Sequence, residues 1–311
     1  MAEKNKIFTN TIFVTVAALL CCALWGSATP FIKIGYALAL PHRDVASTIL
    51  FAGVRFTLAG IITVIIYSIA RRKFLYPKKE NLLKVAHISA FQTVIQYIFF
   101  YIGLANTSGV KGTIASGSNA FFAILIASLI FRQEKLTFKK IVACIIGFAG
   151  VILINLKGLT LSMNLLGDGF VIFSAMAYGV SSALIKCYSK HEDPVVLSGY
   201  QFMLGGAVMV LAGALFGGYI EITSVAAAAV LVYLAFLSAI AYSLWGVLLK
   251  YNPISKVTIF SFMIPVFGVI LSKLMLTKAS NVTPVNLIVT LVLICIGIVM
   301  LNYKSDKRKV E

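Results

Sequence analysis

Long apolar runs separated by short polar connections dominate the pattern of this chain. A helix that crosses a bilayer needs about 20 mostly apolar residues, and the chain divides into ten stretches of this kind. The expected spans are 11–38, 47–70, 83–105, 110–131, 139–156, 166–188, 194–217, 225–250, 255–276 and 284–303. The pattern therefore predicts an all-α integral membrane protein with ten transmembrane helices.

The positions of lysine and arginine predict how these helices are oriented. Cytoplasmic flanks of membrane helices are enriched in both residues. If the N-terminus is cytoplasmic, 20 of the 27 basic residues fall on cytoplasmic flanks, five fall on outer flanks, and Lys33 and Arg55 lie within spans. The cytoplasmic set is Lys4, Lys6, Arg71, Arg72, Lys73, Lys78, Lys79, Lys84, Arg132, Lys135, Lys139, Lys140, Lys186, Lys190, Lys250, Lys256, Lys304, Lys307, Arg308 and Lys309. Both termini are therefore expected on the cytoplasmic side.

Composition agrees with a membrane protein and narrows its partners. Apolar residues make up 60% of the chain and charged residues 12%, unlike ordinary soluble domains. The net charge of +17 lies in short clusters between apolar runs, which favours anionic lipid headgroups of the inner leaflet over nucleic acid. The five cysteines lack paired metal-ligand spacing, so no metal or cofactor is expected. The N-terminus imitates a signal peptide, but its apolar run is too long, and we expect no cleavage.

The second half of the chain repeats the first. A shift of about 146 residues places "FAGVRFTLAGI", from Phe51, over "LSGYQFMLGGA", from Leu197, and pairs Arg55 with Gln201. A slightly larger shift places "WGSATPFIK", from Trp25, over "YGVSSALIK", from Tyr178. Each unit, 11–156 and 166–303, contains five expected spans, so the second copy enters the membrane from the opposite side. Two inverted five-helix repeats are an architecture that lets one site face each side in turn.

Three motifs resemble those of a known family. They are the aromatic-glycine pair near a lysine in "WGSATPFIK", the "RF" of the second span, and "SLIFRQEKLTFKKIVACIIGFAGVILI" between the fourth and fifth spans. Over about Val14 to Asn302 the chain is similar to EamA-type members of the drug/metabolite transporter superfamily. The resemblance implies a transporter of small metabolites, such as amino acids. Asn119 departs from the pattern where a proline is frequent, and Ser280 departs where a glutamate like Glu134 is frequent.

Two cations lie within expected spans, where an unpaired charge costs about 2.5 to 3.5 kcal/mol. Lys33 is about 7 Å from the outer end of its helix, so its ammonium either reaches the headgroups or borders an aqueous path shared with Lys186. Arg55 is about 12 Å deep. Its guanidinium is either tied to hydroxyls or to carbonyls freed at Pro30, where we expect a helix interruption, or it binds a carboxylate or phosphate in a cavity.

Neutral side chains complete the set of candidate substrate-binding residues. Gln96, Asn119, Ser182 and Gln201 offer hydrogen bonds within spans, although many membrane serines simply bond to their own helix. The repeat pairs Trp25 with Tyr178, and these rings could flank a substrate, whereas most of the other aromatic residues are expected to serve packing or to lie at the membrane interfaces. The full set is Trp25, Lys33, Arg55, Gln96, Asn119, Tyr178, Ser182 and Gln201.

The acidic residues lie in tails, loops and helix ends, which argues against a buried carboxylate relay and against cationic drug efflux. The scattered histidines and acids also provide no catalytic constellation, so an enzyme is not expected. We therefore expect a secondary transporter in the cell membrane that exports a small carboxylate-bearing metabolite, such as an amino acid. Alternatives are a facilitator or exchanger of nucleosides or phosphorylated metabolites, or a membrane sensor or scaffold. The sequence leaves substrate, coupling and oligomeric state open.

Overall fold

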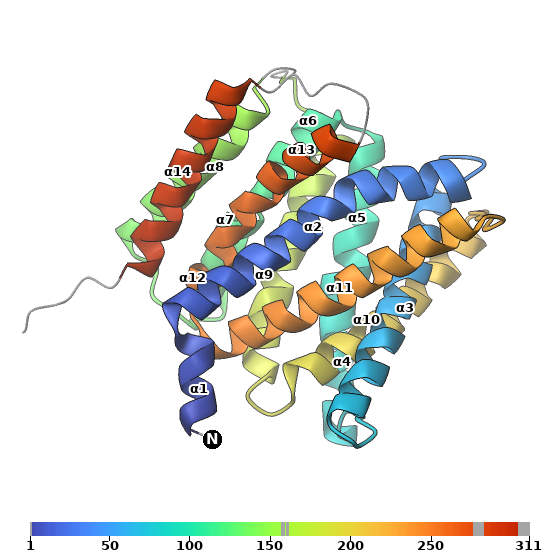
Figure 1. Ribbon diagram of the computed structural model, residues 1–311, viewed down its shortest axis with the longest axis horizontal. Helices are drawn as coiled ribbons and strands as arrows, with labels where there is room; N and C mark the ends of the chain where they lie inside the picture. The colour runs from blue at the N-terminus through green and yellow to red at the C-terminus, as the bar shows by residue number, and fades with distance from the viewer. Residues whose placement is uncertain (1, 157–158, 160–161, 276–282, 304–311) are drawn as a thin grey trace, which may run out of the picture.

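A computed structural model describes residues 2–156, 159, 162–275 and 283–303, which form a bundle of helices (Figure 1). Ser280 and several basic residues of the flanks (Lys157, Lys278, Lys304, Lys307, Arg308 and Lys309) lie outside this range. The α-helices are α1 (Ala2–Thr9), α2 (Thr11–Ala39), α3 (Val45–Ala70), α4 (Leu82–Ile88), α5 (Gln96–Ala105), α6 (Gly109–Gly117), α7 (Asn119–Leu125), α8 (Phe138–Ile154), α9 (Phe170–Tyr188), α10 (Pro194–Leu215), α11 (Val225–Tyr251), α12 (Ile254–Thr258), α13 (Met263–Met275) and α14 (Pro284–Asn302).

In the described part of the chain, nine helical stretches are long and apolar enough to cross a membrane. They are Thr11–Ala39, Val45–Ala70, Lys79–Ala105, Gly109–Ile130, Leu165–Tyr188, Pro194–Leu215, Val225–Tyr251, Ile254–Met275 and Val285–Asn302. The remaining expected span, 139–156, corresponds to α8, whose 17 residues fall short of the usual length. An integral membrane protein is therefore confirmed, and the count of ten stays a prediction.

Several spans are built from more than one type of helix. The π-helical segments η2 (Ser89–Ile95), η3 (Ile126–Ile130) and η4 (Leu165–Gly169) continue directly into or out of α-helices. The short helices η1 (Lys79–Asn81) and η5 (Ile259–Phe262) have 3₁₀ geometry. Such segments change the rotation of the residues that follow, so sequence spacing alone does not tell which side chains share a face.

Pro30 does not interrupt its helix, contrary to the expectation from the sequence. It lies inside α2, which is continuous from Thr11 to Ala39. Proline within a membrane helix is tolerated where neighbouring helices and side chains compensate for the lost backbone hydrogen bond. Here α2 packs along both α11 and α13, and its proline is buried among them.

The most extensive helix contact is the crossing of α3 and α10. Its backbones approach at four glycines, Gly53 and Gly60 of α3 and Gly199 and Gly206 of α10. A methyl group on Gly60 would lie 2.5 Å from the carbonyl oxygen of Gly199, and one on Gly206 would lie 2.8 Å from that of Gly53. Small residues at such a crossing permit tight van der Waals packing inside a membrane.

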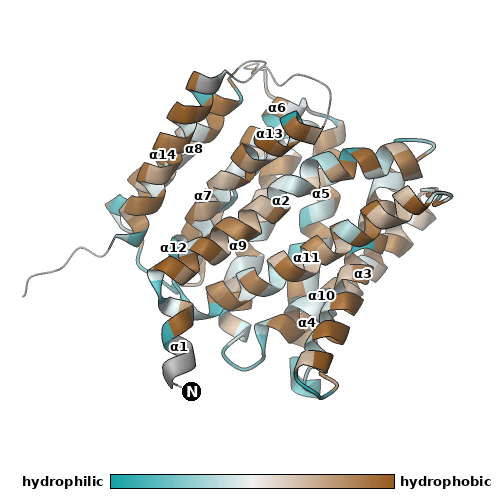
Figure 2. Ribbon diagram, in the orientation of Figure 1, coloured by the Kyte–Doolittle hydropathy of each residue, from teal (hydrophilic) through white to brown (hydrophobic). Residues whose placement is uncertain are grey.

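A second close pair, α8 and α14, runs along one edge of the bundle (Figure 1). A methyl group on Gly297 would lie 2.8 Å from the Ala143 carbonyl oxygen, and one on Gly150 would lie 3.1 Å from that of Thr290. The Thr290 hydroxyl donates to the Gly150 carbonyl at 3.2 Å. The helices are mostly hydrophobic along their lengths (Figure 2), and many large apolar side chains, such as Ile69 of α3, are exposed, as expected for contact with lipid.

Candidate functional site

Arg55 is buried near the middle of α3, with only 4% of its surface exposed. Its guanidinium carbon lies 4.2 Å from the centre of the Phe56 ring and 5.9 Å from that of Tyr97. The ion pairs found within the described residues do not include Arg55, and its Nε has no hydrogen-bond partner. A desolvated cation is thus held by aromatic faces, which attract it through the ring quadrupole.

Four rings from four helices form an aromatic cage beside this cation, comprising Phe56, Tyr97, Phe202 and Tyr242. Phe56 stacks on Phe202 at 5.1 Å between ring centres and lies 4.4 Å from Tyr97. Phe202 meets Tyr242 edge to face at 4.8 Å. The hydroxyls of Tyr97 and Tyr242 share a hydrogen bond that closes the aromatic cage. The α3–α10 crossing therefore brings Phe56 and Phe202 together, and α5 and α11 supply the tyrosines.

Several tyrosines lie near the charge of the buried Arg55. They are Tyr36, Tyr97, Tyr101 and Tyr242. Tyr36 is one of the buried groups whose hydroxyl has no hydrogen bond of good geometry. Neutral hydroxyls accept hydrogen bonds from a guanidinium without cancelling its charge, so the positive charge stays available to an anion.

Trp25 extends the cluster away from Arg55. Its ring packs edge to face against Tyr242 and against Trp245, at 5.0 Å in each case. The indole N–H groups of Trp25 and Trp245 are buried without an acceptor. Tyr178 lies beside Trp245 and is 5% exposed, and its hydroxyl also lacks a well-formed hydrogen bond. The structure therefore places Trp25 and Tyr178 in one cluster with Trp245 between them.

Amide side chains form a second polar group. Gln201 of α10 is fully buried, and its Oε1 accepts a hydrogen bond from the Thr93 hydroxyl at 2.7 Å. Its Nε2 has no partner, and neither have the buried Oε1 atoms of Gln92 and Gln96. Buried amides without partners are costly in a membrane protein. These glutamines hence retain hydrogen-bonding capacity for another polar group.

The Ser182 hydroxyl is bonded within its own helix, and a role of this residue in substrate binding stays a prediction. Its Oγ donates to the Tyr178 carbonyl at 2.9 Å, one turn earlier in α9. The same bonding within the helix satisfies Ser116, Ser118, Ser181 and Ser261. Serine in an apolar helix satisfies its hydroxyl locally when no other partner is closer.

Three further positions lie apart from the contacts of Arg55. Lys33 is exposed on α2, which agrees with an ammonium that reaches the headgroups. Lys186 donates its ammonium hydrogens to the carbonyls of Leu249, at 3.0 Å, and Asn252, and so caps the end of α11. Asn119 is half-buried as the first residue of α7, directly after the helix break at Ser118.

The acidic residues that the structure describes near the spans have structural partners. Asp168 accepts hydrogen bonds from Thr107 and from the Asn164 N–H and lies 3.5 Å from the Lys111 ammonium. Glu134 lies 3.3 Å from the Lys140 ammonium and accepts from both the N–H and the hydroxyl of Ser255. Within the described ranges, no group of three histidine, cysteine or acidic residues could hold a metal ion.

Three aromatic residues beside the candidate site, Tyr97, Tyr242 and Trp245, were not among the candidates that the sequence suggested. Each is buried or half-buried, and they link Arg55 to Trp25 and Tyr178. A spacing signal was present, because Tyr97 and Tyr242 are 145 residues apart, within one residue of the shift between the two halves. Chemically, the cluster combines a cation that has no ion pair within the described residues with aromatic walls, which suits a small anionic or zwitterionic molecule.

Comparison with known proteins defines the class. The sequence profile of the EamA-like transporter family matches residues 12–156 and again residues 165–303. The chain belongs to this family and is a membrane transporter of the drug/metabolite type.

Relatives carry the same description. The chain is 22% identical to the uncharacterized transporter YvbV of Bacillus subtilis over 92% of this chain and 90% of that protein. It is also 27% identical to an uncharacterized transporter of Archaeoglobus fulgidus, and this match covers 61% of this chain and 63% of the archaeal protein. A crystal structure of a protein 15% identical superimposes with a TM-score of 0.74 and covers 93% of this chain and 96% of that one. The last likeness shows the fold alone.

Proposed function

We propose that this transporter exports a small metabolite with a carboxylate, such as an amino acid, and that Arg55 binds the carboxylate. The observation that carries the proposal is a buried guanidinium with an unpartnered Nε and no ion pair in the described structure. A planar guanidinium matches a carboxylate through parallel hydrogen bonds. The substrate would supply the missing negative charge.

Alternating access between two inverted repeats, 11–156 and 166–303, is the mechanism we propose. The double match of the family profile supports two repeats. The α3–α10 crossing supports a two-fold relation, because a shift of 146 residues equates Gly53 with Gly199 and Gly60 with Gly206. Gly53 meets Gly206 and Gly60 meets Gly199, the reciprocal pattern that a two-fold axis produces. Such an axis in the membrane plane lets the halves exchange roles around one site.

The distribution of basic residues supports an orientation with both termini in the cytoplasm, in a cell membrane with ten crossings. In this orientation α8 would complete the tenth crossing beside α14. Its shortness is compatible with local thinning of the bilayer or with less tilt than its neighbours. The anionic inner leaflet would then face the basic connections between the spans.

Transport in proteoliposomes tests the function. Purified protein is reconstituted, and a panel of labelled amino acids, organic acids, nucleosides and sugar phosphates is followed in both directions across the membrane. We expect at least one carboxylate to cross faster than in empty vesicles, and its uncharged amide derivative to compete poorly. Competition by phosphates alone would indicate phosphorylated metabolites instead. If no solute crosses faster than in empty vesicles, a sensor or scaffold role replaces transport.

A further inference from the structure

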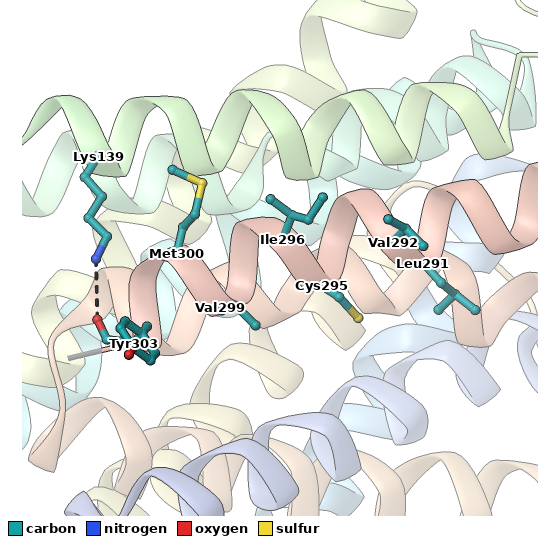
Figure 3. A pocket seen from close by; sticks show the side chains of 8 residues that line it. All are labelled: Lys139, Leu291, Val292, Cys295, Ile296, Val299, Met300 and Tyr303. Carbon is teal, nitrogen blue, oxygen red and sulfur yellow. Dashed lines mark hydrogen bonds between the residues drawn. The ribbon is translucent and has the colours of Figure 1, made fainter. Parts of the chain in front are cut away.

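A groove of about 640 Å³ lies on the outer surface of the α8–α14 pair. One end is marked by Leu291 and the other by Lys139 and Tyr303, and the walls between them come from apolar side chains of α14 such as Cys295, Ile296 and Val299 (Figure 3). The central wall residues are exposed, so the groove opens toward the membrane and away from Arg55.

The two ends of the groove differ in chemistry. Lys139 extends from α8 across to the end of α14, where its ammonium lies 3.4 Å from the Tyr303 carbonyl oxygen (Figure 3). Within the described residues, Lys139 has no carboxylate partner, because the nearby Glu134 pairs with Lys140. The other end, at Leu291 and Val292, is uncharged. The groove therefore presents one positive charge to whatever occupies it.

The length of the groove matches one leaflet. The 12-residue separation of Leu291 and Tyr303 corresponds to about 18 Å along a helix, while half of the hydrocarbon core is about 15 Å thick. Tyr303 is 71% exposed, as expected of an aromatic residue at headgroup level. In the proposed orientation, Lys139 and Tyr303 lie at the cytoplasmic surface, where anionic lipids concentrate.

From these observations, we propose that the groove is a binding site for an anionic phospholipid of the inner leaflet. The lipid phosphate meets the Lys139 ammonium, and one acyl chain lies against Ile296, Val299 and Cys295. The site is separate from the proposed substrate site and rests only on the proposed membrane orientation.

Native mass spectrometry of the purified full-length protein tests the site. The protein is stripped of lipid in a neutral detergent and titrated with phosphatidylglycerol or phosphatidylcholine. We expect the wild type to bind one phosphatidylglycerol more tightly than phosphatidylcholine, and Lys139→Gln to reduce this preference about fivefold, since a lysine near an anionic surface contributes about 1 kcal/mol. Lys135→Gln is the matched control, because Lys135 is an exposed lysine in the connection just before α8 and does not line the groove.

Val299→Trp provides an independent variant, because an indole at this exposed position fills the groove without entering the core. It should weaken binding of both lipids while leaving the fold, judged by elution profile and thermal stability, unchanged. Equal affinity for the two lipids in the wild type, or equal effects of Lys139→Gln and Lys135→Gln, would overturn the proposal. Oxidative cross-linking of two chains through Cys295 in native membranes would also overturn it, because a second copy would then occupy the groove.

Discussion

Arg55 of α3 and Gln201 of α10 are related by the shift between the halves, and each precedes a phenylalanine of the stacked pair Phe56 and Phe202. Their partners differ. The guanidinium lies over an aromatic ring and keeps an unpartnered Nε, whereas the Gln201 amide accepts a hydrogen bond from Thr93. Both side chains are buried, with 4% of Arg55 and none of Gln201 exposed.

The difference separates what the fold requires from what one half adds. Both helices use glycines at the crossing and a phenylalanine in the stack. Only one of them carries a charge, so the crossing does not depend on it. A buried charge costs free energy wherever it is placed, which agrees with the proposed role of Arg55 in binding a carboxylate.

Replacement of Arg55 by its counterpart should have the largest effect on transport. Arg55→Gln is expected to lower the affinity for a carboxylate substrate about ten- to a hundredfold, because a hydrogen bond to a charged group contributes about 1.5–3 kcal/mol. The elution profile and thermal stability should be unchanged. The measurement is substrate binding and uptake in proteoliposomes.

Lys33→Gln is the control for Arg55→Gln. It also removes a cation from an expected span, but Lys33 is exposed, so substrate affinity should stay within about twofold of the wild type. Aggregation of Arg55→Gln would show that the charge supports folding, and equal affinity loss in both variants would remove the distinction between the two cations.

The close approach of α3 and α10, which both helices achieve with glycines, can be tested by substitution of one of these glycines. Gly60→Ala places a methyl group 2.5 Å from the Gly199 carbonyl oxygen, so α3 and α10 must separate. Overpacking of this kind costs about 1–3 kcal/mol, which should appear as a lower midpoint of thermal unfolding. Gly268→Ala is the matched control, because the atom of a neighbouring helix nearest to its methyl group, the Gly26 carbonyl oxygen, would lie 3.6 Å away. Similar midpoints for the two variants would contradict the tight crossing.

Smaller effects on stability are expected from removing either partner of the hydrogen bond between Thr93 and Gln201, and the two effects should differ. Thr93→Val leaves the Gln201 amide buried without its one hydrogen bond and is expected to cost about 1–2 kcal/mol. Gln201→Leu removes the amide altogether and should be close to neutral, because an apolar group then replaces an incompletely satisfied polar one. Thermal unfolding of both variants makes the comparison. If Gln201→Leu destabilises more than Thr93→Val, the amide has further partners that matter for stability.

Helix positions were predictable because membrane helices are specified by local composition. The expected span 194–217 corresponds to α10, which begins at Pro194 and ends at Leu215. The burial of Arg55 was also predictable from its depth within an apolar run, because no long side chain reaches the surface comfortably from there. Both inferences use only rise per residue and hydropathy.

The partners of Arg55 were only partly predictable. The repeat relates Tyr97 to Tyr242 and Phe56 to Phe202 in the sequence, but spacing alone does not show that these rings meet beside the guanidinium. The π-helical segment η2 shifts the rotation of α5 and so determines where Tyr97 points. The continuous path of α2 through Pro30 left no open helix end for the guanidinium. The bond of Ser182 within its own helix agrees with the local alternative stated from the sequence, because such a bond requires no tertiary contact.

The smallest effect is expected at the beginnings of α3 and α10, which both start with an aspartate N-cap. Asp44 accepts hydrogen bonds from the Ser47 N–H and hydroxyl, each at 2.8 Å, and Asp193 accepts from the Val195 N–H. Asp193 also accepts from the Tyr67 hydroxyl at 2.7 Å and lies 3.8 Å from Arg71. Asp44→Ala should therefore cost about 1 kcal/mol, the typical value of an N-cap, and Asp193→Ala should cost more.

The stabilising effect of the Asp44 charge should depend on pH. The Ser47 N–H, and then its hydroxyl, hold the pKa of Asp44 below its ordinary value, so the folded state favours the charged form. Its stabilisation is complete above the unfolded pKa of about 4 and is lost as the pH falls through the lower folded pKa. Thermal unfolding between about pH 3 and 7 should show a smaller acid-induced loss of stability for Asp44→Asn, which keeps the cap but not the charge.

If Asp44→Asn loses as much stability in acid as the wild type, other carboxylates, such as Glu192, account for the loss. Burial raises the pKa of Glu192, but the hydrogen bonds that its carboxylate accepts from Asn81 and from the Lys78 N–H outweigh this effect and lower it. In that case Glu192→Gln, and not Asp44→Asn, should show the smaller acid-induced loss of stability.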